Sequence, residues 1–258
     1  MPKSIAVAGK GGTGKTTIAA LLITQLVLQN QGPVLAIDAD PDSNLGDLLG
    51  IEPEQSIGDL REEVLDAMKR LPAGMTKASY VEAGLHQIIA EAEGVDLIAM
   101  GRGEGAGCYC ALNNMIRKFS DDLTPSYRWV VMDNEAGLEH LSRRTTRNID
   151  ALLVVVSDNP LSLRSAEKIQ AITDDLDTRI GRKYIVTNMI PDARMEMFKR
   201  RLEPFRIPHL IDIPYDPHLE EVIFQGEPLK NLNGSPIMKT IQTIIETVGG
   251  EDANSRGK

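Results

Sequence analysis

A glycine-rich segment near the start of the chain has the residue types and spacing of a phosphate-binding loop. Gly9, Gly14, Lys15 and Thr16, within AVAGKGGTGKTT at 6–17, follow the pattern G-x-x-x-x-G-K-T. In that pattern backbone N–H groups surround the phosphates, the lysine neutralises them and the hydroxyl binds Mg²⁺. The predicted nucleotide-binding residues are Gly11, Gly12, Thr13, Gly14, Lys15, Thr16 and Thr17, with Thr16 also a predicted magnesium ligand.

Three aspartates stand at the ends of apolar runs, where carboxylates could organise a metal ion and a water molecule. Asp38 and Asp40 follow the run PVLAI, and Asp133 ends the run RWVVMD. Carboxylates two residues apart after a strand can orient Mg²⁺ and an attacking water, and Asp133 can hold a magnesium-bound water. Two structural alternatives stay open here, namely an Asx turn at Asp38 and Asp40 and a plain capping role for Asp133.

The two cysteines of the chain, Cys108 and Cys110, form a C-x-C pair within GRGEGAGCYCALNNMIRKF at 101–119. The glycines predict a loop and the pattern from about Ala111 predicts a helix, so the pair stands at a junction where both thiolates could reach one ion. Closed Zn²⁺ sites and square-planar Ni²⁺ sites need four ligands, and a twofold dimer would supply the second pair. Free buried cysteines and a strained intrachain disulfide remain open as alternatives.

The segments that must position these side chains alternate between strand and helix patterns. Helical patterns include 16–32, which ends at a glycine, and 56–92, where we expect two helices packed on the outside. Runs rich in valine and isoleucine predict seven strands, at 4–9, 33–38, 95–101, 128–133, 151–157, 183–188 and 209–214. This alternation predicts an α/β fold, a single P-loop NTPase domain with a mainly parallel sheet of seven or eight strands and helices on both faces.

The candidate residues follow these strands, and ligands of such sheets bind at the carboxyl ends of the strands. We expect the ATPase domain to span 1–248 and the polar segment at 249–258 to be a disordered tail.

The composition limits the possible partners. The chain has 258 residues with 42% hydrophobic and 25% charged residues, which is typical of a globular protein. A formal net charge of −9 argues against a dedicated binder of nucleic acid or acidic membranes, although Arg143, Arg144 and Arg147 form a local basic group. No apolar run is long enough to cross a membrane and no signal peptide is evident, so we expect a cytoplasmic protein without a membrane partner.

The loop KGGTGKTT resembles the deviant Walker A motif of the MinD, ParA, ArsA and nitrogenase iron protein family of dimeric ATPases. Further segments resemble that family in the same order: VLAIDADPDSNL its switch I, VVMDNEAG its Walker B and switch II, VTNM and IPYDPHLEEVIFQGEP its adenine contacts. The resemblance implies a homodimer that hydrolyses ATP with Mg²⁺.

The same resemblance implies roles for individual residues. Lys10 would reach the nucleotide of the partner subunit, and Lys15 would bind the phosphates of its own subunit. Asp40 would position the attacking water, while Asp38 would serve magnesium and the switch. Lys10, Lys15 and Asp40 are thus the predicted catalytic residues, Asp38 and Asp133 predicted magnesium ligands, and Asn188 and Pro214 predicted adenine contacts.

The segment GCYC, followed by two asparagines, resembles the nickel-insertion accessory ATPases of carbon monoxide dehydrogenase and acetyl-CoA synthase, the CooC and AcsF type. DNEAGLEHLSRRT also resembles their switch II. This resemblance implies that Cys108 and Cys110 of two subunits bind Ni²⁺ or Zn²⁺, and that hydrolysis accompanies nickel delivery to a client, one of these two enzymes.

Other functions predict different residues. A nitrogenase-like iron protein would carry a cysteine beside switch II, and a MinD-like membrane regulator a basic amphipathic helix at its C-terminus. Neither pattern is present in the sequence. A ParA-like or MinD-like partitioning or positioning ATPase is the alternative function, and a metal store that uses nucleotide only as a structural ligand is a further one. Salt-sensitive DNA binding would favour partitioning, and ATP turnover would exclude the store.

Overall fold

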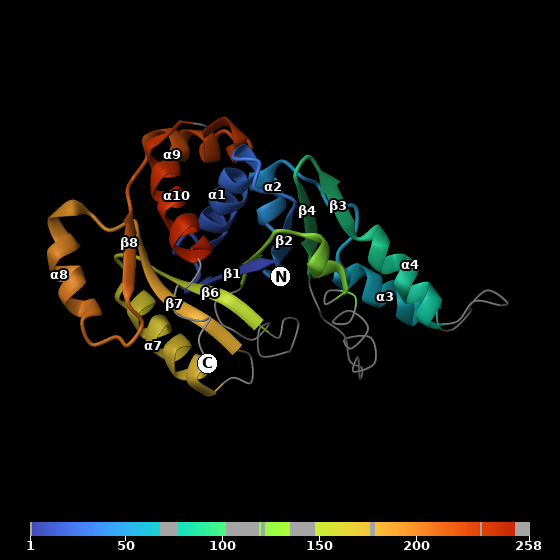
Figure 1. Cartoon of the computed structure of the whole chain (residues 1–258), viewed down its shortest axis with the longest axis horizontal. Coiled ribbons are helices and arrows are strands. Elements are labelled where there is room, and N and C mark those ends of the chain that lie inside the picture. The colour runs from blue at the N-terminus through green and yellow to red at the C-terminus, as the bar shows by residue number, and fades with distance from the viewer. Residues whose placement is uncertain are drawn as a thin grey trace.

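Eight strands form one sheet in the computed structural model (Figure 1), which describes residues 2–67, 77–101, 119, 122–134, 148–175, 179–232 and 234–250. The strands are β1 (Lys3–Gly9), β2 (Val34–Asp38), β3 (Ile89–Ala92), β4 (Val95–Ala99), β5 (Trp129–Asp133), β6 (Asn148–Val156), β7 (Arg179–Asn188) and β8 (His209–Ile213). The α-helices are α1 (Lys15–Leu28), α2 (Leu45–Leu49), α3 (Ile57–Ala67), α4 (Lys77–Gln87), α7 (Pro160–Asp175), α8 (Asp192–Leu202), α9 (Pro217–Phe224) and α10 (Pro236–Gly249), with 3-10 helices η1 (Thr124–Ser126) and η2 (Leu229–Leu232).

The strand order is β3-β4-β2-β5-β1-β6-β7-β8, and every neighbouring pair is parallel except β3 and β4. This confirms the predicted mainly parallel sheet and all seven predicted strands. Because β1 lies between β5 and β6, the loop that follows β1 leaves from the middle of the sheet. The carboxyl ends of β2, β5 and β1 therefore meet at one edge, where parallel sheets bind ligands.

Two expectations about local structure need correction. The helical region predicted at 56–92 contains α3 and α4, but its end, Ile89–Ala92, forms the antiparallel edge strand β3. The pattern misled because β3 has four residues and only two of them are partly buried, so its alternation is too short to read. Helix α1 ends at Leu28, earlier than the predicted 32.

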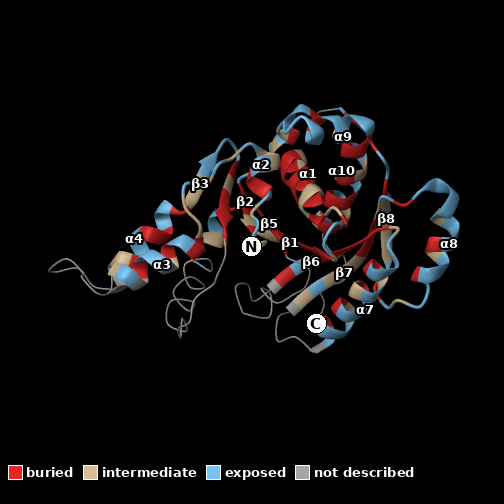
Figure 2. Cartoon of the chain, turned by 180° about the vertical axis from the view of Figure 1, so that it is seen from behind, coloured by how far each residue is buried: buried red, intermediate tan, exposed pale blue. Residues whose placement is uncertain are grey.

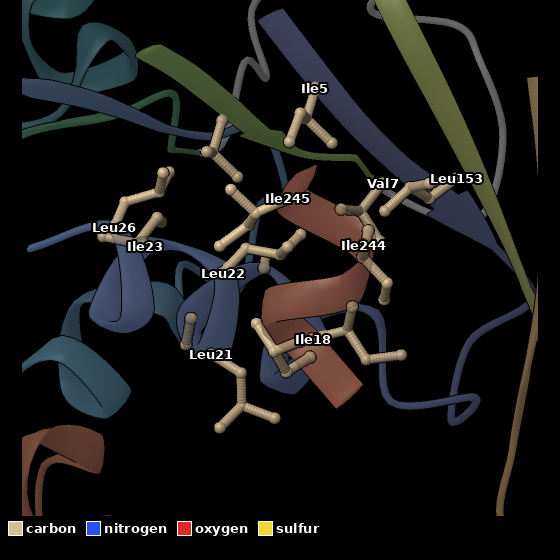
Figure 3. Close-up of a cluster of buried hydrophobic side chains, with 14 of the residues drawn as sticks. Ile5, Val7, Ile18, Leu21, Leu22, Ile23, Leu26, Leu153, Ile244 and Ile245 are labelled. Atoms are coloured by element: carbon tan, nitrogen blue, oxygen red, sulfur yellow. The ribbon is translucent and has the colours of Figure 1, made fainter. Parts of the chain in front are cut away.

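One face of the sheet is covered by α1 and α10. Figure 3 shows Ile5, Val7 and Leu153 of the strands pointing toward Ile244 and Ile245 of α10, with Leu22 of α1 in the same cluster. Helix α1 is apolar on most sides because it packs against both the sheet and α10. Helix α10 is amphipathic, and its buried stripe consists of Ile237, Met238, Ile241, Ile244, Ile245 and Val248.

The second face is covered by α3, α4, α7 and α8. Alternate residues of the same strands face it, so that Ala6 and Ala8 of β1 join this second core while Ile5 and Val7 join the first. Figure 2 shows buried strands in the centre and exposed residues along the outer sides of these helices. The prediction of helices on both faces is thus confirmed.

Helix α10 extends to Gly249, where Arg182 of β7 donates hydrogen bonds to the carbonyls of Thr247 (3.0 Å) and Val248 (2.6 Å). Residues 251–258 of the predicted tail lie outside the described residues. No helix in the described part of the chain has the length and apolarity that crossing a membrane requires.

Candidate functional site

The phosphate-binding loop connects β1 to α1 with a backbone that needs glycine at two positions. Gly9 has a φ of 149°, and a Cβ there would lie 2.4 Å from the carbonyl oxygen of Val155 in β6. Gly14, the N-cap of α1, has a left-handed φ of 88°. Between them, the N–H and the hydroxyl of Thr13 both donate to the Lys10 carbonyl, at 3.3 and 2.8 Å. The loop conformation is thus fixed by its own sequence.

The N-terminus of α1 is arranged as an anion site. Gly14 provides no side-chain cap, so the first N–H groups of α1 have no capping side-chain oxygen to which they can donate. Lys15 is the first helical residue and is 6% exposed, while Thr16 and Thr17 are half-buried. Gly11 and Gly12 are exposed and Lys10 is half-buried at the start of the loop. The structure therefore gathers all predicted phosphate-binding residues around one helix end.

Two buried aspartates lie opposite each other on neighbouring strands. Asp38 of β2 and Asp133 of β5 are register partners at the carboxyl ends of their strands, and they are 1% and 0% exposed. Burial raises the pKa of Asp38 to about 6 and that of Asp133 to about 7. For Asp133, the nearby Thr16 hydroxyl and then the charge of Lys15 oppose this rise.

The two carboxylates differ in their partners. Asp38 accepts hydrogen bonds from the backbone N–H of Asp40 (3.1 Å) and of Leu45 (3.0 Å), which begins α2. Neither oxygen of Asp133 has a hydrogen-bond partner of normal geometry among the described residues. A buried carboxylate without a well-formed hydrogen bond is costly, and a divalent cation held with the Thr16 hydroxyl would relieve that cost. The residues present therefore fit Mg²⁺ best at Asp133, whereas direct contact of Asp38 with the ion stays a prediction.

The Asx turns considered as an alternative at Asp38 and Asp40 are present. Asp38 accepts from the N–H of Asp40, and Asp40 in turn accepts from the N–H of Asp42 at 3.0 Å. These turns do not exclude a catalytic role, because Asp40 remains only partly buried after β2, which is separated from β1 and its phosphate loop by the single strand β5. Its predicted contact with the attacking water stays a prediction.

The predicted adenine contacts, Asn188 and Pro214, are brought together. Asn188 ends β7 and pairs in register with Ile213, the last residue of β8, so Pro214 follows directly beside it. The Asn188 side chain also donates to the Thr13 carbonyl at 2.9 Å, a contact that the sequence did not predict. Asn134 was missed as well, although its amide donates to the Val7 carbonyl at 3.1 Å and joins β5 to β1. No local signal reveals such bonds, because they join residues more than 100 positions apart.

The predicted metal ligands Cys108 and Cys110 lie within 102–118, outside the described residues. The basic group Arg143, Arg144 and Arg147 lies within 135–147, also outside them. In the described ranges there is no group of three or more histidine, cysteine, aspartate or glutamate side chains that could hold a metal ion. The intersubunit nickel or zinc site therefore stays a prediction.

The chain is similar to known proteins over most of its length. Residues 4–229 match the CobQ/CobB/MinD/ParA nucleotide-binding domain family. An uncharacterised ATP-binding protein of Methanocaldococcus jannaschii is 39% identical over 247 residues, which cover 95% of this chain and 97% of that protein. The carbon monoxide dehydrogenase accessory protein CooC of Rhodospirillum rubrum is 33% identical over 184 residues, 67% of this chain and 69% of CooC.

A solved structure shares the fold. The septum site-determining protein MinD of Pyrococcus horikoshii, complexed with Mg-ADP, aligns with a TM-score of 0.65 and 20% identity over 96% of each chain. The phosphate loop, its helix and the buried aspartates all fall inside the matched residues 4–229. The chain therefore belongs to the CobQ/CobB/MinD/ParA nucleotide-binding domain family and is a P-loop ATPase of the MinD and ParA type.

Proposed function

We propose that this ATPase is a metallochaperone that dimerises with nucleotide, binds nickel between its subunits and helps to mature carbon monoxide dehydrogenase or acetyl-CoA synthase. Cys108 and Cys110 from two subunits would supply four thiolates to one Ni²⁺ or Zn²⁺ ion. The similarity to the accessory protein CooC supports this client class.

One observation carries the proposal: the chain enters its cysteine segment beside the nucleotide site. Strand β4 is the neighbour of β2, with Ala99 in register with Asp38. The next residue, Met100, donates its N–H to the Asp38 carbonyl at 2.8 Å. Residues 102–118, which contain both cysteines, follow Gly101 directly. A movement of Asp38 on nucleotide binding would therefore be transmitted through Met100 to the start of the segment that contains both cysteines.

The nucleotide site would perform hydrolysis with the residues already gathered there. Lys15 and the N–H groups at the start of α1 hold the phosphates. Asp133 and Thr16 would hold Mg²⁺, which supplies charge neutralisation at the phosphate oxygens. Asp40 orients a water molecule, whose oxygen bonds to the γ-phosphorus as the bond to the bridging oxygen of ADP breaks. ADP, phosphate and a proton leave.

Metal titration with mass measurement tests the proposal. The purified protein is dialysed against Ni²⁺ or Zn²⁺ with ATP, with ADP or without nucleotide, and its mass and metal content are measured. We expect one ion per dimer in the ATP-bound form.

The variants Cys108→Ser and Cys110→Ser provide the matched comparison. Each should lose the ion and keep the ATP affinity and thermal midpoint of the unchanged chain. If the double variant retains one ion per dimer, the intersubunit thiolate site is wrong.

The alternative, a partitioning or positioning ATPase, is compatible with the same family. It predicts ATP-dependent binding to DNA that weakens steeply as salt rises, because phosphate contacts release counterions. A fluorescence-anisotropy titration at 50 and 200 mM salt, with the cysteine variants as controls, distinguishes the two functions. DNA binding that the cysteine variants keep, together with an absence of stoichiometric metal, would favour partitioning.

A further inference from the structure

The side chain of Asn188 forms a hydrogen bond with the phosphate loop. Its Nδ2 atom lies 2.9 Å from the carbonyl oxygen of Thr13. Because a carbonyl oxygen can only accept, the side-chain amide nitrogen and not the side-chain oxygen must face Thr13. The contact joins the end of β7 to the loop after β1, although β6 lies between these strands (Figure 1).

The strand register explains how Asn188 reaches the loop. Gly9 of β1 is level with Val155 of β6, and Val155 is level with Val186 of β7. Asn188 therefore stands two residues, about 6–7 Å of strand, beyond the level at which the loop begins. Its side chain can cross over the end of β6, where a Cβ on Gly9 would already touch the carbonyl of Val155.

The bond fixes one particular peptide of the loop. The Thr13 carbonyl and the Gly14 N–H belong to the same planar trans peptide and point in opposite directions. Anchoring the carbonyl on Asn188 therefore sets the direction of the Gly14 N–H. The Thr13 N–H and hydroxyl donate to the Lys10 carbonyl. Thr13 is therefore hydrogen-bonded through its N–H, its hydroxyl and its carbonyl.

Asn188 also packs on Gly14. A Cβ built on Gly14 would lie 2.4 Å from Nδ2 of Asn188, so the amide covers the Cα of the residue that caps α1. The amide group thus touches the loop at the point where the loop turns into α1, the helix whose first N–H groups would face a bound phosphate.

We infer that Asn188 is a positioning residue for phosphate binding: it holds the Thr13–Gly14 peptide in the orientation that presents its N–H to the ligand. This role is separate from the predicted adenine contact, because the donated hydrogen bond to Thr13 leaves the Oδ1 oxygen for other partners. The inference depends on nucleotide binding by the loop and is independent of nickel delivery.

Tripolyphosphate, which has no base, separates the two roles. Its Mg²⁺-dependent affinity is measured by calorimetry for the unchanged chain, Asn188→Ala and Asn188→Ser. A positioning role predicts that Asn188→Ala weakens tripolyphosphate binding roughly 3- to 10-fold, as the loss of one net hydrogen bond would. Asn188→Ser, which keeps a short hydroxyl donor, should lose no more than Asn188→Ala.

Asn159→Ala is the matched control. Asn159 lies in the loop after β6, and its Oδ1 accepts from the N–H of Leu161 at 2.9 Å. Its removal should leave tripolyphosphate affinity unchanged. Thermal midpoints without ligand show whether each variant folds, and the serine variant replaces the alanine variant if the latter does not.

The inference is overturned if Asn188→Ala loses ATP affinity and keeps the tripolyphosphate affinity of the unchanged chain, since Asn188 would then act through the base alone. If the unchanged chain itself binds ATP without retaining nickel, the proposed metallochaperone role fails and the role of Asn188 stands.

Discussion

At the scale of single residues, the two buried aspartates of the site differ in their hydrogen-bond partners. Asp38 is buried and its oxygens accept two backbone hydrogen bonds, whereas Asp133 is buried and its oxygens have no partner of normal geometry in the described part of the chain. Equal sequence contexts, an aspartate ending an apolar strand, thus give unequal chemistry. The sequence predicted both aspartates as magnesium ligands. It could not show which carboxylate lacks hydrogen-bond partners, because the fold determines that the Leu45 N–H lies next to Asp38.

Replacing Asp133 by asparagine should stabilise the protein in the absence of metal. Burial raises the pKa of Asp133 from 3.8 in the unfolded chain to about 7 in the folded protein. The folded protein therefore loses stability as the pH rises from 3.8 through 7, because the buried carboxyl group must give up its proton. At pH 8 with a chelator, Asp133→Asn should raise the free energy of unfolding by about 1–3 kcal/mol. At pH 5 the difference should shrink. Urea unfolding at both pH values measures this.

The same variant should lose the stabilisation that Mg-ADP gives. Thermal unfolding with ADP and Mg²⁺ should raise the midpoint of the unchanged chain and leave that of Asp133→Asn near its value with ADP alone. An equal rise in both proteins would contradict Asp133 as the magnesium ligand.

Gly14 and Asn188 should show coupled effects on stability. Gly14→Ala places a methyl group 2.4 Å from the Asn188 amide and also imposes a left-handed φ, at about 1–2 kcal/mol, on alanine. In an Asn188→Ala background the collision disappears and only the φ cost remains. A double-mutant cycle by urea unfolding should therefore give a coupling of about 0.5–3 kcal/mol, and strict additivity would argue against the contact.

At the scale of elements, α10 completes the first core and is held at both its face and its end. Its buried stripe packs on α1 and the sheet, and Arg182 donates to its last carbonyls, where the helix dipole is negative. The sequence predicted the seven longer strands and the helices α1, α3 and α4, because their apolar periodicity is local. It missed β3 and α2, which have four and five residues, because such short segments carry too few repeats to show a period.

Truncating a buried side chain of α10 should lower the free energy of unfolding, whereas truncating an exposed neighbouring side chain should change it little. Ile244 is fully buried, so Ile244→Ala should lower the free energy of unfolding by about 2–5 kcal/mol through lost burial and a residual cavity. Thr243→Ala on the exposed side should change it by less than about 0.5 kcal/mol. Urea denaturation of both variants tests the packing, and similar small losses would show that α10 is dispensable to the core.

At the scale of the whole molecule, the strand order places the phosphate loop, the aspartates and the adenine-side residues on one edge of one sheet. This arrangement followed from the sequence because parallel sheets have a common carboxyl edge and the motifs come directly after strands. The bonds between loops did not follow, since Asn188 to Thr13 and Met100 to Asp38 depend on which strands become neighbours.

The two lysines of the loop should separate binding from dimerisation. Lys15 is buried at the start of α1, so Lys15→Ala should abolish ATP binding. We expect the affinity to fall at least 100-fold, because a charged hydrogen bond to phosphate contributes on the order of 3 kcal/mol to binding. Lys10→Ala should keep ATP affinity within about 3-fold and abolish ATP-dependent dimerisation. Light scattering with ATP checks the mass, and a dimeric Lys10→Ala protein would refute the cross-subunit role.

The edge strand β3 has a consequence for how copies of this chain can meet. It has four residues and is followed by a turn, and its exposed Glu91 and the nearby exposed Glu93 carry negative charge along the free edge. A neighbouring strand that tried to extend the sheet there would bring its own matching glutamates into repulsion. Extension of the sheet by a second copy of the chain is thereby disfavoured at β3.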